Sequence, residues 1–339
     1  MEFQPNNSSH YLEYYPEIDT EPKDQFVESL SNIRSKQVHR LAVEDLLNAL
    51  NHEGMPSTEI DLPQEAGLYL EPTVYDDLES RGQLPQAAIF QSNELHSLGR
   101  EDSRHKVFFG SLSLIDYTSG INHTMTVAVK PFNLSAADTT SLGIHEYAMY
   151  EYLAQEGIET PQPLGLLFED DQLFVLSEFV PEVITLDSLD WPKLDNDTVD
   201  NVIGRGLESL LMLHQIGIFH GDAGFKNLTL QPNINEHWIV DLEMALSIKN
   251  SANTTPKEDI IQLVINDLAD VIWSLHQYGV IQEGATPSET FQIQYEKVLL
   301  PYRQRVWSSR ENTDILNIIR SELDTIDRYF YHYAMPEDS

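Results

Sequence analysis

The spacing of apolar residues changes along the chain, and the clearest pattern lies in its second half. Between residues 198 and 216, apolar side chains recur every three or four positions, which predicts a helix with one wide buried face. Gly217 follows directly and is expected to end this helix. The same period returns at 259–275, 288–300 and 314–333, so this half of the chain is expected to be mainly helical.

The middle of the chain carries short apolar runs typical of β-strands. They predict three successive antiparallel strands and then a β-hairpin, at 88–90, 107–115, 125–129, and at 163–168 with 172–179. A helix is expected around 144–153, with Gly157 as its C-terminal cap.

The first 87 residues carry weaker signals. They read as an acidic tail that is mobile or docks on a partner (1–21), a helical pattern (38–50), and an irregular stretch (61–81) with a possible short helix at 75–80. We therefore expect three parts: an N-terminal extension (1–87) that could dock a partner, a sheet-rich part (88–180) and a helical part (181–339).

The charge of the chain is extreme, with 55 Asp and Glu against 20 Lys and Arg and a formal net charge of −35. Such a chain would repel the phosphates of nucleic acids, so no nucleic-acid partner is expected. Two explanations of the charge stay open. An acidic cleft would attract a cationic substrate, and a charged, solvated surface would serve solubility alone.

The absence of cysteine excludes disulfides, thiolate zinc sites and cysteine nucleophiles. The first residues lack the basic and apolar regions of a signal peptide, and no run reaches the about 18 apolar residues of a membrane span. We therefore expect a cytoplasmic protein that does not enter a membrane.

One block stands out for its chemistry, His-Gly-Asp-Ala-Gly-Phe-Lys-Asn at 220–227, followed by Val-Asp-Leu-Glu at 240–243. Between the two blocks, short apolar runs flank a turn composition, which predicts a hairpin that brings Asn227 and Asp241 to the same end. Phosphoryl transfer needs a carboxylate to orient the acceptor hydroxyl and oxygen ligands for Mg²⁺. Asp222 is the candidate base, and Asn227 and Asp241 are the candidate metal ligands, with Glu243 for a second ion. The alternative is that these are ordinary loop acids.

Four further residues in or near this block could serve either structure or catalysis. His220 is expected to be structural, with an imidazole that bonds the backbone. Lys226 could neutralise the transferring phosphoryl group or be a solvated lysine. Asp267 and Asp270 could brace the loop from the next helix or be solvated helix acids.

The pattern of His-Gly-Asp, Asn five residues after the Asp, and then Asp-x-Glu resembles the aminoglycoside phosphotransferase and choline kinase branch of the protein-kinase-like superfamily. The resemblance implies an α+β, bilobal protein-kinase-like fold: a small antiparallel-sheet N-lobe and a larger helical C-lobe, here after an N-terminal extension. It also implies ATP and Mg²⁺ as cofactors. Gly221 stands where many protein kinases have an Arg that reads a phosphorylated activation loop, so that control is not expected.

The same resemblance assigns the nucleotide ligands. Lys130, at the end of Val-Ala-Val-Lys, would bind the α- and β-phosphates, held by Glu146, with Glu151 as the rival partner. Glu178 and Val180 lie in the segment that would pair with adenine through its backbone. The glycine-rich phosphate loop is degenerate, and Ser103 is the remaining candidate there.

We expect an ATP- and Mg²⁺-dependent phosphotransferase that acts on a hydroxyl of a small molecule, which would be a cation if the acidic charge serves to attract the substrate. The short stretch between Glu243 and the next helix lacks a long activation segment, which favours a small acceptor. Two alternatives remain: an atypical protein kinase with a protein substrate, and a catalytically silent pseudokinase that serves as a binding module.

Overall fold

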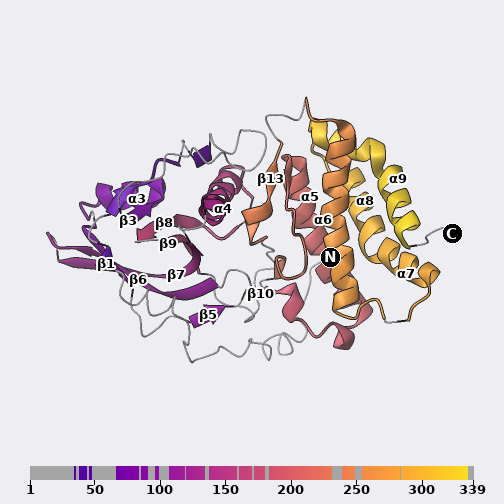
Figure 1. The fold of residues 1–339 in the computed structure, drawn as a ribbon, viewed down its shortest axis with the longest axis horizontal. Coiled ribbons are helices and arrows are strands. Elements are labelled where there is room, and N and C mark those ends of the chain that lie inside the picture. The colour runs from indigo at the N-terminus through magenta and orange to yellow at the C-terminus, as the bar shows by residue number, and fades with distance from the viewer. Residues whose placement is uncertain are drawn as a thin grey trace. The chain divides into compact units, whose positions relative to one another are not determined.

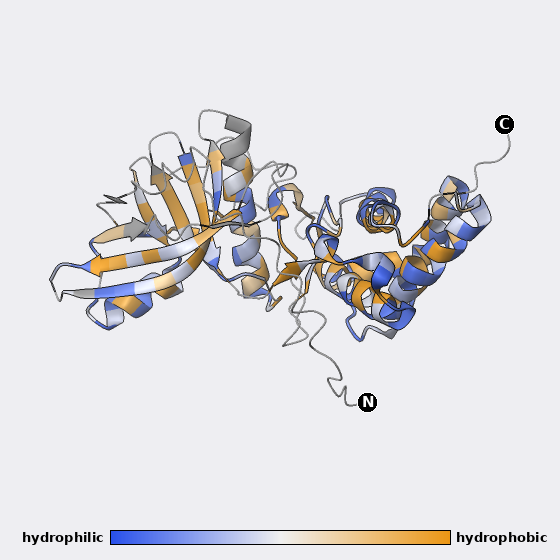
Figure 2. Cartoon of the chain, turned by 90° about the horizontal axis from the view of Figure 1, so that it is seen from below, coloured by the Kyte–Doolittle hydropathy of each residue, from blue (hydrophilic) through white to orange (hydrophobic). Residues whose placement is uncertain are grey.

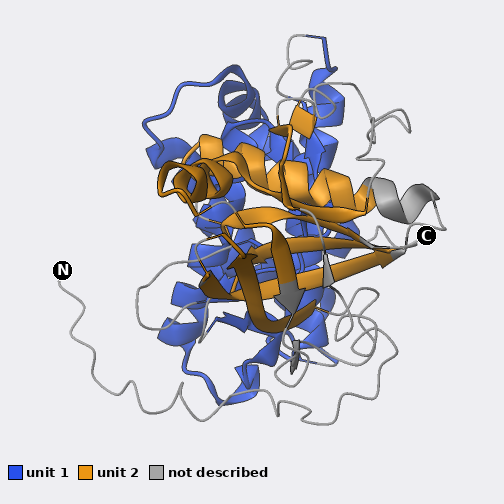
Figure 3. Ribbon diagram, turned by 90° about the vertical axis from the view of Figure 1, so that its left-hand side faces the viewer, with its two compact units in different colours: residues 1–14, 182–339 blue, residues 15–181 orange. Residues whose placement is uncertain are grey.

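The computed structural model describes most of the chain in two compact units. The described residues are 34–35, 38–43, 46–47, 66–83, 85–90, 96–98, 107–118, 120–133, 137–158, 160–169, 172–179, 183–230, 239–248, 254–282 and 284–334. One unit ends at Pro181 and the other resumes at Glu182 (Figure 3). Each is described by itself.

The unit that ends at Pro181 is built on a nine-stranded sheet (Figure 1). Its strands are β1 (Arg34–Ser35), β2 (Val38–Arg40), β3 (Gly67–Leu70), β4 (Ala87–Phe90), β5 (His96–Leu98), β6 (Val107–Asp116), β7 (Ile121–Asn133), β8 (Pro163–Glu169) and β9 (Gln172–Glu178). The order is β1-β4-β6-β7-β9-β8-β3-β2, and β5 also pairs with β6. All these pairs are antiparallel except β2 with β3.

This sheet contradicts the expected fold class. The kinase-like arrangement with a small antiparallel N-lobe sheet is wrong, because the structure is mixed α/β with a large, mostly antiparallel sheet. Short strands from before residue 88 complete it: β1 pairs with β4, and β3 joins β2 to β8. Leu68 and Leu70 of β3 are fully buried, so this stretch forms part of the core.

Alternation along the strands supplies both faces of the sheet with apolar side chains. On β8, Leu167 belongs to a cluster that also holds Leu78 of α3 (Pro72–Ser80). Its neighbour Leu166 belongs to another cluster, with Tyr147 of α4 (Ala137–Gln155). In Figure 2 the hydrophobic colour accordingly gathers on these strands.

The other unit is mainly helical. Its long helices are α5 (Asn196–Gln215), α6 (Lys257–Gln277) and α9 (Asp314–Ala334); between the last two lie α7 (Pro287–Gln294), a π-helical turn (Tyr295–Leu299) and α8 (Leu300–Ser308). Figure 1 shows α5, α6, α8 and α9 side by side. Two small ribbons pair β10 (Ile184–Thr185) with β12 (Thr229–Leu230) and β11 (Ile218–Phe219) with β13 (Leu246–Ser247). Three 3-10 turns complete the unit: η2 (Leu186–Ser188), η3 (Trp191–Lys193) and η4 (Leu242–Met244).

Most predicted elements are confirmed: β4, β6, β7, the β8–β9 hairpin, α3, and the helices α4, α5, α6, α7 and α9. Helix α8 was missed, because it begins at Leu300, where the predicted helical segment 288–300 ends. The helix predicted from residue 38 is wrong at Val38–Arg40, which pair with β3 as a strand. The hairpin predicted between the two site blocks is present as an antiparallel bridge of Leu228 and Ile239, while 231–238 lie outside the described residues. The tail predicted at 1–21 lies outside them too. Among the described residues, no helix is long and apolar enough to cross a bilayer.

Candidate phosphotransfer site

Helix α5 leads directly into the loop that carries Asp222. Asp195 caps the start of the helix, accepting a hydrogen bond from the backbone of Thr198 at 2.7 Å. Gly217, with φ of 79°, ends it. Strand β11 then pairs with β13, fixing the chain just before His220.

Helix α6 holds the loop through three side chains. Asp267 accepts hydrogen bonds from the backbone N–H groups of His220 and Gly221, both at 2.8 Å. Asp270 accepts from the N–H of Ala223 at 3.0 Å, and the hydroxyl of Ser274 accepts from the N–H of Phe225 at 3.1 Å. The prediction that Asp267 and Asp270 brace the loop is therefore confirmed.

Asp267 is itself fixed by a buried network. The Nε2 of His214 lies 2.9 Å from its carboxylate, and the Nδ1 of His214 lies 2.8 Å from the Tyr302 hydroxyl. Burial would raise the pKa of Asp267, but the hydrogen bond from His214, the neighbouring imidazoles and the N–H of Gly221 hold it below its ordinary value. This carboxyl group is therefore ionised at neutral pH although it is fully buried.

Gly221 is required by its position. Its φ is 75°, and a Cβ built there would lie 2.5 Å from the carbonyl oxygen of Met244. Any side chain at this position would strain the backbone and push Met244, the last residue of η4, away from the loop. Local packing thus explains the glycine.

His220 and Asn227 tie the loop to the segment that carries Asp241. The backbone N–H of Asp222 donates to Nδ1 of His220, so Nε2 carries the proton and donates to the carbonyl of Val240 at 3.0 Å. The side-chain amide of Asn227 donates to the backbone carbonyl of Asp222 at 2.8 Å. The backbone carbonyl of Asn227 accepts a hydrogen bond from the N–H of Val240. The structural role predicted for His220 is confirmed.

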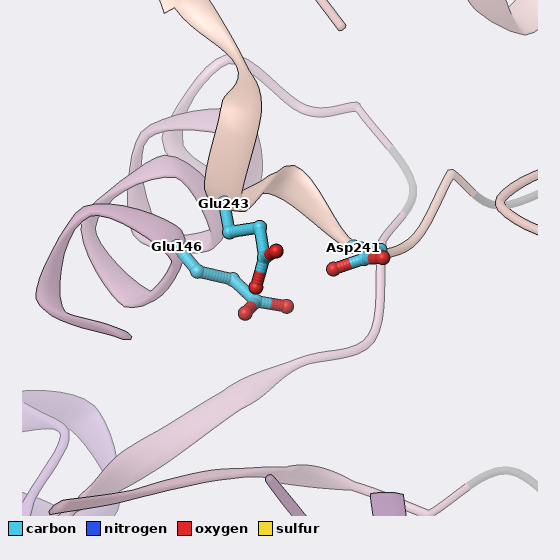
Figure 4. A group of neighbouring side chains, drawn as sticks. All are labelled: Glu146, Asp241 and Glu243. Atoms are coloured by element: carbon cyan, nitrogen blue, oxygen red, sulfur yellow. The ribbon is translucent and has the colours of Figure 1, made fainter. Parts of the chain in front are cut away.

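Asp241 has an unusual backbone. Among the described residues it is the only non-glycine residue with positive φ, at 63°. Such a conformation costs on the order of 1 kcal/mol and often marks a functional position. Asp241 precedes the turn η4, which carries the buried Glu243; Figure 4 shows both carboxylates projecting from this segment.

Lys226 links these acids. Its Nζ lies 2.7 Å from the carboxylate of Asp222. Burial lowers the pKa of Lys226, but the hydrogen bond to Asp222 and the charges of Asp222, Asp241 and Glu243 outweigh it and raise the pKa above its ordinary value. The charges of all three carboxylates thus act on one ammonium.

The donor set fits a hard cation. Carboxylate oxygens of Asp241 and Glu243 and the amide oxygen of Asn227 are the ligand types that Mg²⁺ prefers. The amide nitrogen of Asn227 is used on the Asp222 carbonyl, which fixes which end of the amide can serve as ligand.

The other unit contains the predicted lysine–glutamate pair. The Nζ of Lys130 on β7 lies 2.8 Å from the carboxylate of Glu146 on α4, and both side chains are almost completely buried. Figure 4 draws the side chain of Glu146. Glu151, the rival, instead accepts a hydrogen bond from Tyr147 at 2.5 Å. Burial raises the pKa of Glu151 to about 7, against the hydrogen bond from Tyr147 and together with the charge of Glu71.

The remaining candidates are less defined. Glu178 is the last residue of β9; its side chain is exposed, and its N–H donates to the carbonyl of Gln162 at 2.8 Å. Ser103 and Val180 lie outside the described residues.

Sequence reasoning missed three residues that support the loop: His214, Ser274 and Tyr302. Ser274 could have been found, because it lies seven residues after Asp267 and four after Asp270, on one face of α6. An aromatic stack was also missed, in which Phe225 packs between Trp191 and Tyr278, with ring centroids 4.6 and 5.9 Å away.

No protein-family model matches the chain, and neither does any curated protein sequence.

Proposed function

We propose that this chain is a phosphotransferase that uses ATP and Mg²⁺ and moves the γ-phosphoryl group to a hydroxyl of a small molecule in the cytoplasm. One observation carries the proposal. Hydrogen bonds join Asp222 to Asn227, and Asn227 to the segment that carries Asp241 and Glu243. The charges of the three acids all act on Lys226. The resemblance of the two blocks to phosphotransferase motifs supports it.

In this proposal, Asp222 orients the acceptor hydroxyl and accepts its proton. Its ion pair with Lys226 has to open first, which would free the ammonium to meet the negative charge of the phosphoryl group. Asn227, Asp241 and Glu243 would hold the metal. When bound, Mg²⁺ offsets the charge that develops on the phosphate oxygens. Lys130, held by Glu146, would bind nucleotide phosphates.

Asp222→Asn and Asp241→Asn test the two roles separately. With labelled ATP and a panel of amines, sugars and protein extracts, Asp222→Asn should lower transfer by roughly a hundredfold to ten-thousandfold. It should keep the rise in melting temperature that Mg²⁺ and ATP produce, because it leaves the metal ligands intact. Asp241→Asn should lose that rise.

Asp259→Asn is the matched control, because it removes an exposed carboxylate from α6 and should change neither readout. Transfer to polypeptides alone would replace the small acceptor by a protein substrate. A wild-type chain with no transfer and no stabilisation by ATP and Mg²⁺ would refute the proposal; saturating ligand at about 100 times its dissociation constant should add about 2.7 kcal/mol.

A further inference from the structure

Lys226 has an anchored backbone and a side chain that is free to change partners. On one side of it, the N–H of Phe225 donates to the hydroxyl of Ser274 at 3.1 Å. On the other side, the N–H of Asn227 donates to the carbonyl of Gly224 at 2.9 Å. The Lys226 side chain itself is more than half exposed. Its flexible four-carbon stem can therefore move the ammonium while the loop stays in place.

This ammonium lies among the carboxylates of the proposed site. Its Nζ is 2.7 Å from the carboxylate of Asp222, and the charges of Asp241 and Glu243 act on it as well. Asp241 and Glu243 are also the carboxylates proposed to hold Mg²⁺. An ammonium and a divalent cation at this place draw on the same negative charge and repel each other.

Nucleotide phosphates would change this balance. They offer the ammonium a second set of anionic oxygens, with which it can form charge-assisted hydrogen bonds. A complex of ATP with one divalent cation also carries a net negative charge, so the ammonium attracts the complex although it repels the free ion.

We propose that Lys226 makes the site selective for a metal–nucleotide complex over a free divalent cation, an inference that rests on the proposed function. The ammonium opposes a free ion at Asn227, Asp241 and Glu243 and favours the same ion when phosphates arrive with it. Asp222 is released from its ion pair in the same step, so the base becomes available only when the phosphoryl donor is bound.

Calorimetric titration of the full chain tests the proposal, with Mn²⁺ alone and with Mn²⁺ bound to a non-hydrolysable ATP analogue. Mn²⁺ accepts the same oxygen ligands as Mg²⁺. Lys226→Met should bind free Mn²⁺ at least roughly tenfold more tightly than the wild type, because a like charge has left the site. The same variant should bind the Mn²⁺–analogue complex more weakly than the wild type. A purely structural role would not move the two affinities in opposite directions.

Two control variants separate the local charge from other effects. Lys226→Arg keeps the positive charge and should bind both ligands within roughly threefold of the wild type. Lys257→Met removes an exposed ammonium that pairs with Glu322 of α9, and it should bind both ligands as the wild type does. Because both lysine side chains are substantially exposed, all variants should melt as cooperatively as the wild type.

The outcomes distinguish this inference from the proposed function. Unchanged affinity for free Mn²⁺ in Lys226→Met, or tighter binding of both ligands, would overturn the inference alone, provided that the wild type binds the Mn²⁺–analogue complex. A wild-type chain that binds neither ligand would overturn the proposed function and the inference together.

Discussion

At the residue scale, the site depends on two backbone conformations that most side chains avoid. Gly221 and Asp241 both have positive φ, and they lie on the two segments that the site joins. Glycine adopts this conformation freely, whereas Asp241 has to be held there by its surroundings. The strain at Asp241 therefore marks it as a position where geometry is kept at the expense of stability.

Gly221→Ala should destabilise the chain by at least about 2 kcal/mol, because it adds both a strained φ and a clash with the Met244 carbonyl. Gly279→Ala is the matched control, since Gly279 has the same φ of 75° but its nearest neighbour is 3.8 Å away. Urea unfolding measures both. An equal loss in the two variants would show that the close approach at Gly221 is unimportant.

Glu151 gives a pH dependence of the opposite sign to that of most acids. Its pKa is raised to about 7 in the folded chain, so the neutral form is favoured there. The stabilisation is complete below the unfolded pKa of about 4.3 and is lost as the pH rises through about 7. Glu151→Gln should thus be stabilising by roughly 1–3 kcal/mol at about pH 8 and nearly neutral at about pH 4.

Thermal unfolding at the two pH values checks this, with the exposed Glu156→Gln as control. A Glu151→Gln effect that is the same at both pH values would be inconsistent with a raised pKa.

At the element scale, helix α6 sets the shape of the loop that carries Asp222. Three side chains on one face of α6 accept hydrogen bonds from four of the backbone N–H groups between His220 and Phe225. Because a helix is stiff, it can hold these acceptors at fixed spacing. The position of the loop backbone is therefore fixed by a helix that is distant in the sequence.

Asp267→Asn should destabilise the chain by about 3 kcal/mol at neutral pH, because an amide offers one acceptor oxygen to donors that now use two. The lowered pKa of Asp267 adds stability above the unfolded pKa of about 3.9, and that stability is lost as the pH falls through the folded value. In urea unfolding measured at several pH values, Asp267→Asn should reduce the loss of unfolding free energy at acidic pH. The exposed Asp259→Asn should show the same loss as the wild type. If Asp267→Asn lost as much stability at acidic pH as the wild type, that loss would come from other carboxyl groups.

The sequence predicted elements whose signal is local. Helices with a wide apolar stripe and hairpins with a turn between their strands were found. The loop with Asp222 and Asn227 is bonded to the segment that precedes Asp241, as the predicted hairpin requires. The short strands β1 to β3 were missed because their partners are distant, as in Gly67 with Phe168. The contact of His214 with Tyr302, 88 residues away, leaves no local pattern either.

At the scale of the whole chain, the net charge of −35 is the dominant electrostatic fact. The acids outnumber the bases by nearly three to one, and Lys130 and Lys226 are each paired with an acid, Glu146 and Asp222 respectively. Repulsion between like charges weakens a folded state, and dissolved salt screens it.

Raising NaCl from about 0.05 M to about 0.5 M should therefore raise the melting temperature, by roughly 2–4 °C for each kcal/mol of repulsion that is screened. Differential scanning calorimetry measures the shift, and sucrose at equal osmolarity controls for exclusion from the protein surface. A melting temperature that falls or stays constant with salt would mean that the acids do not oppose folding.

The stack of Trp191 on Phe225 has a practical consequence. Trp191 is buried, and its indole N–H donates to the carbonyl of Leu186 at 2.8 Å, so its ring has little freedom of its own. Any displacement of Phe225 must alter the surroundings of this indole. Because Phe225 lies two residues before Asn227, the fluorescence emission of Trp191 should report whether the loop shifts when nucleotide binds.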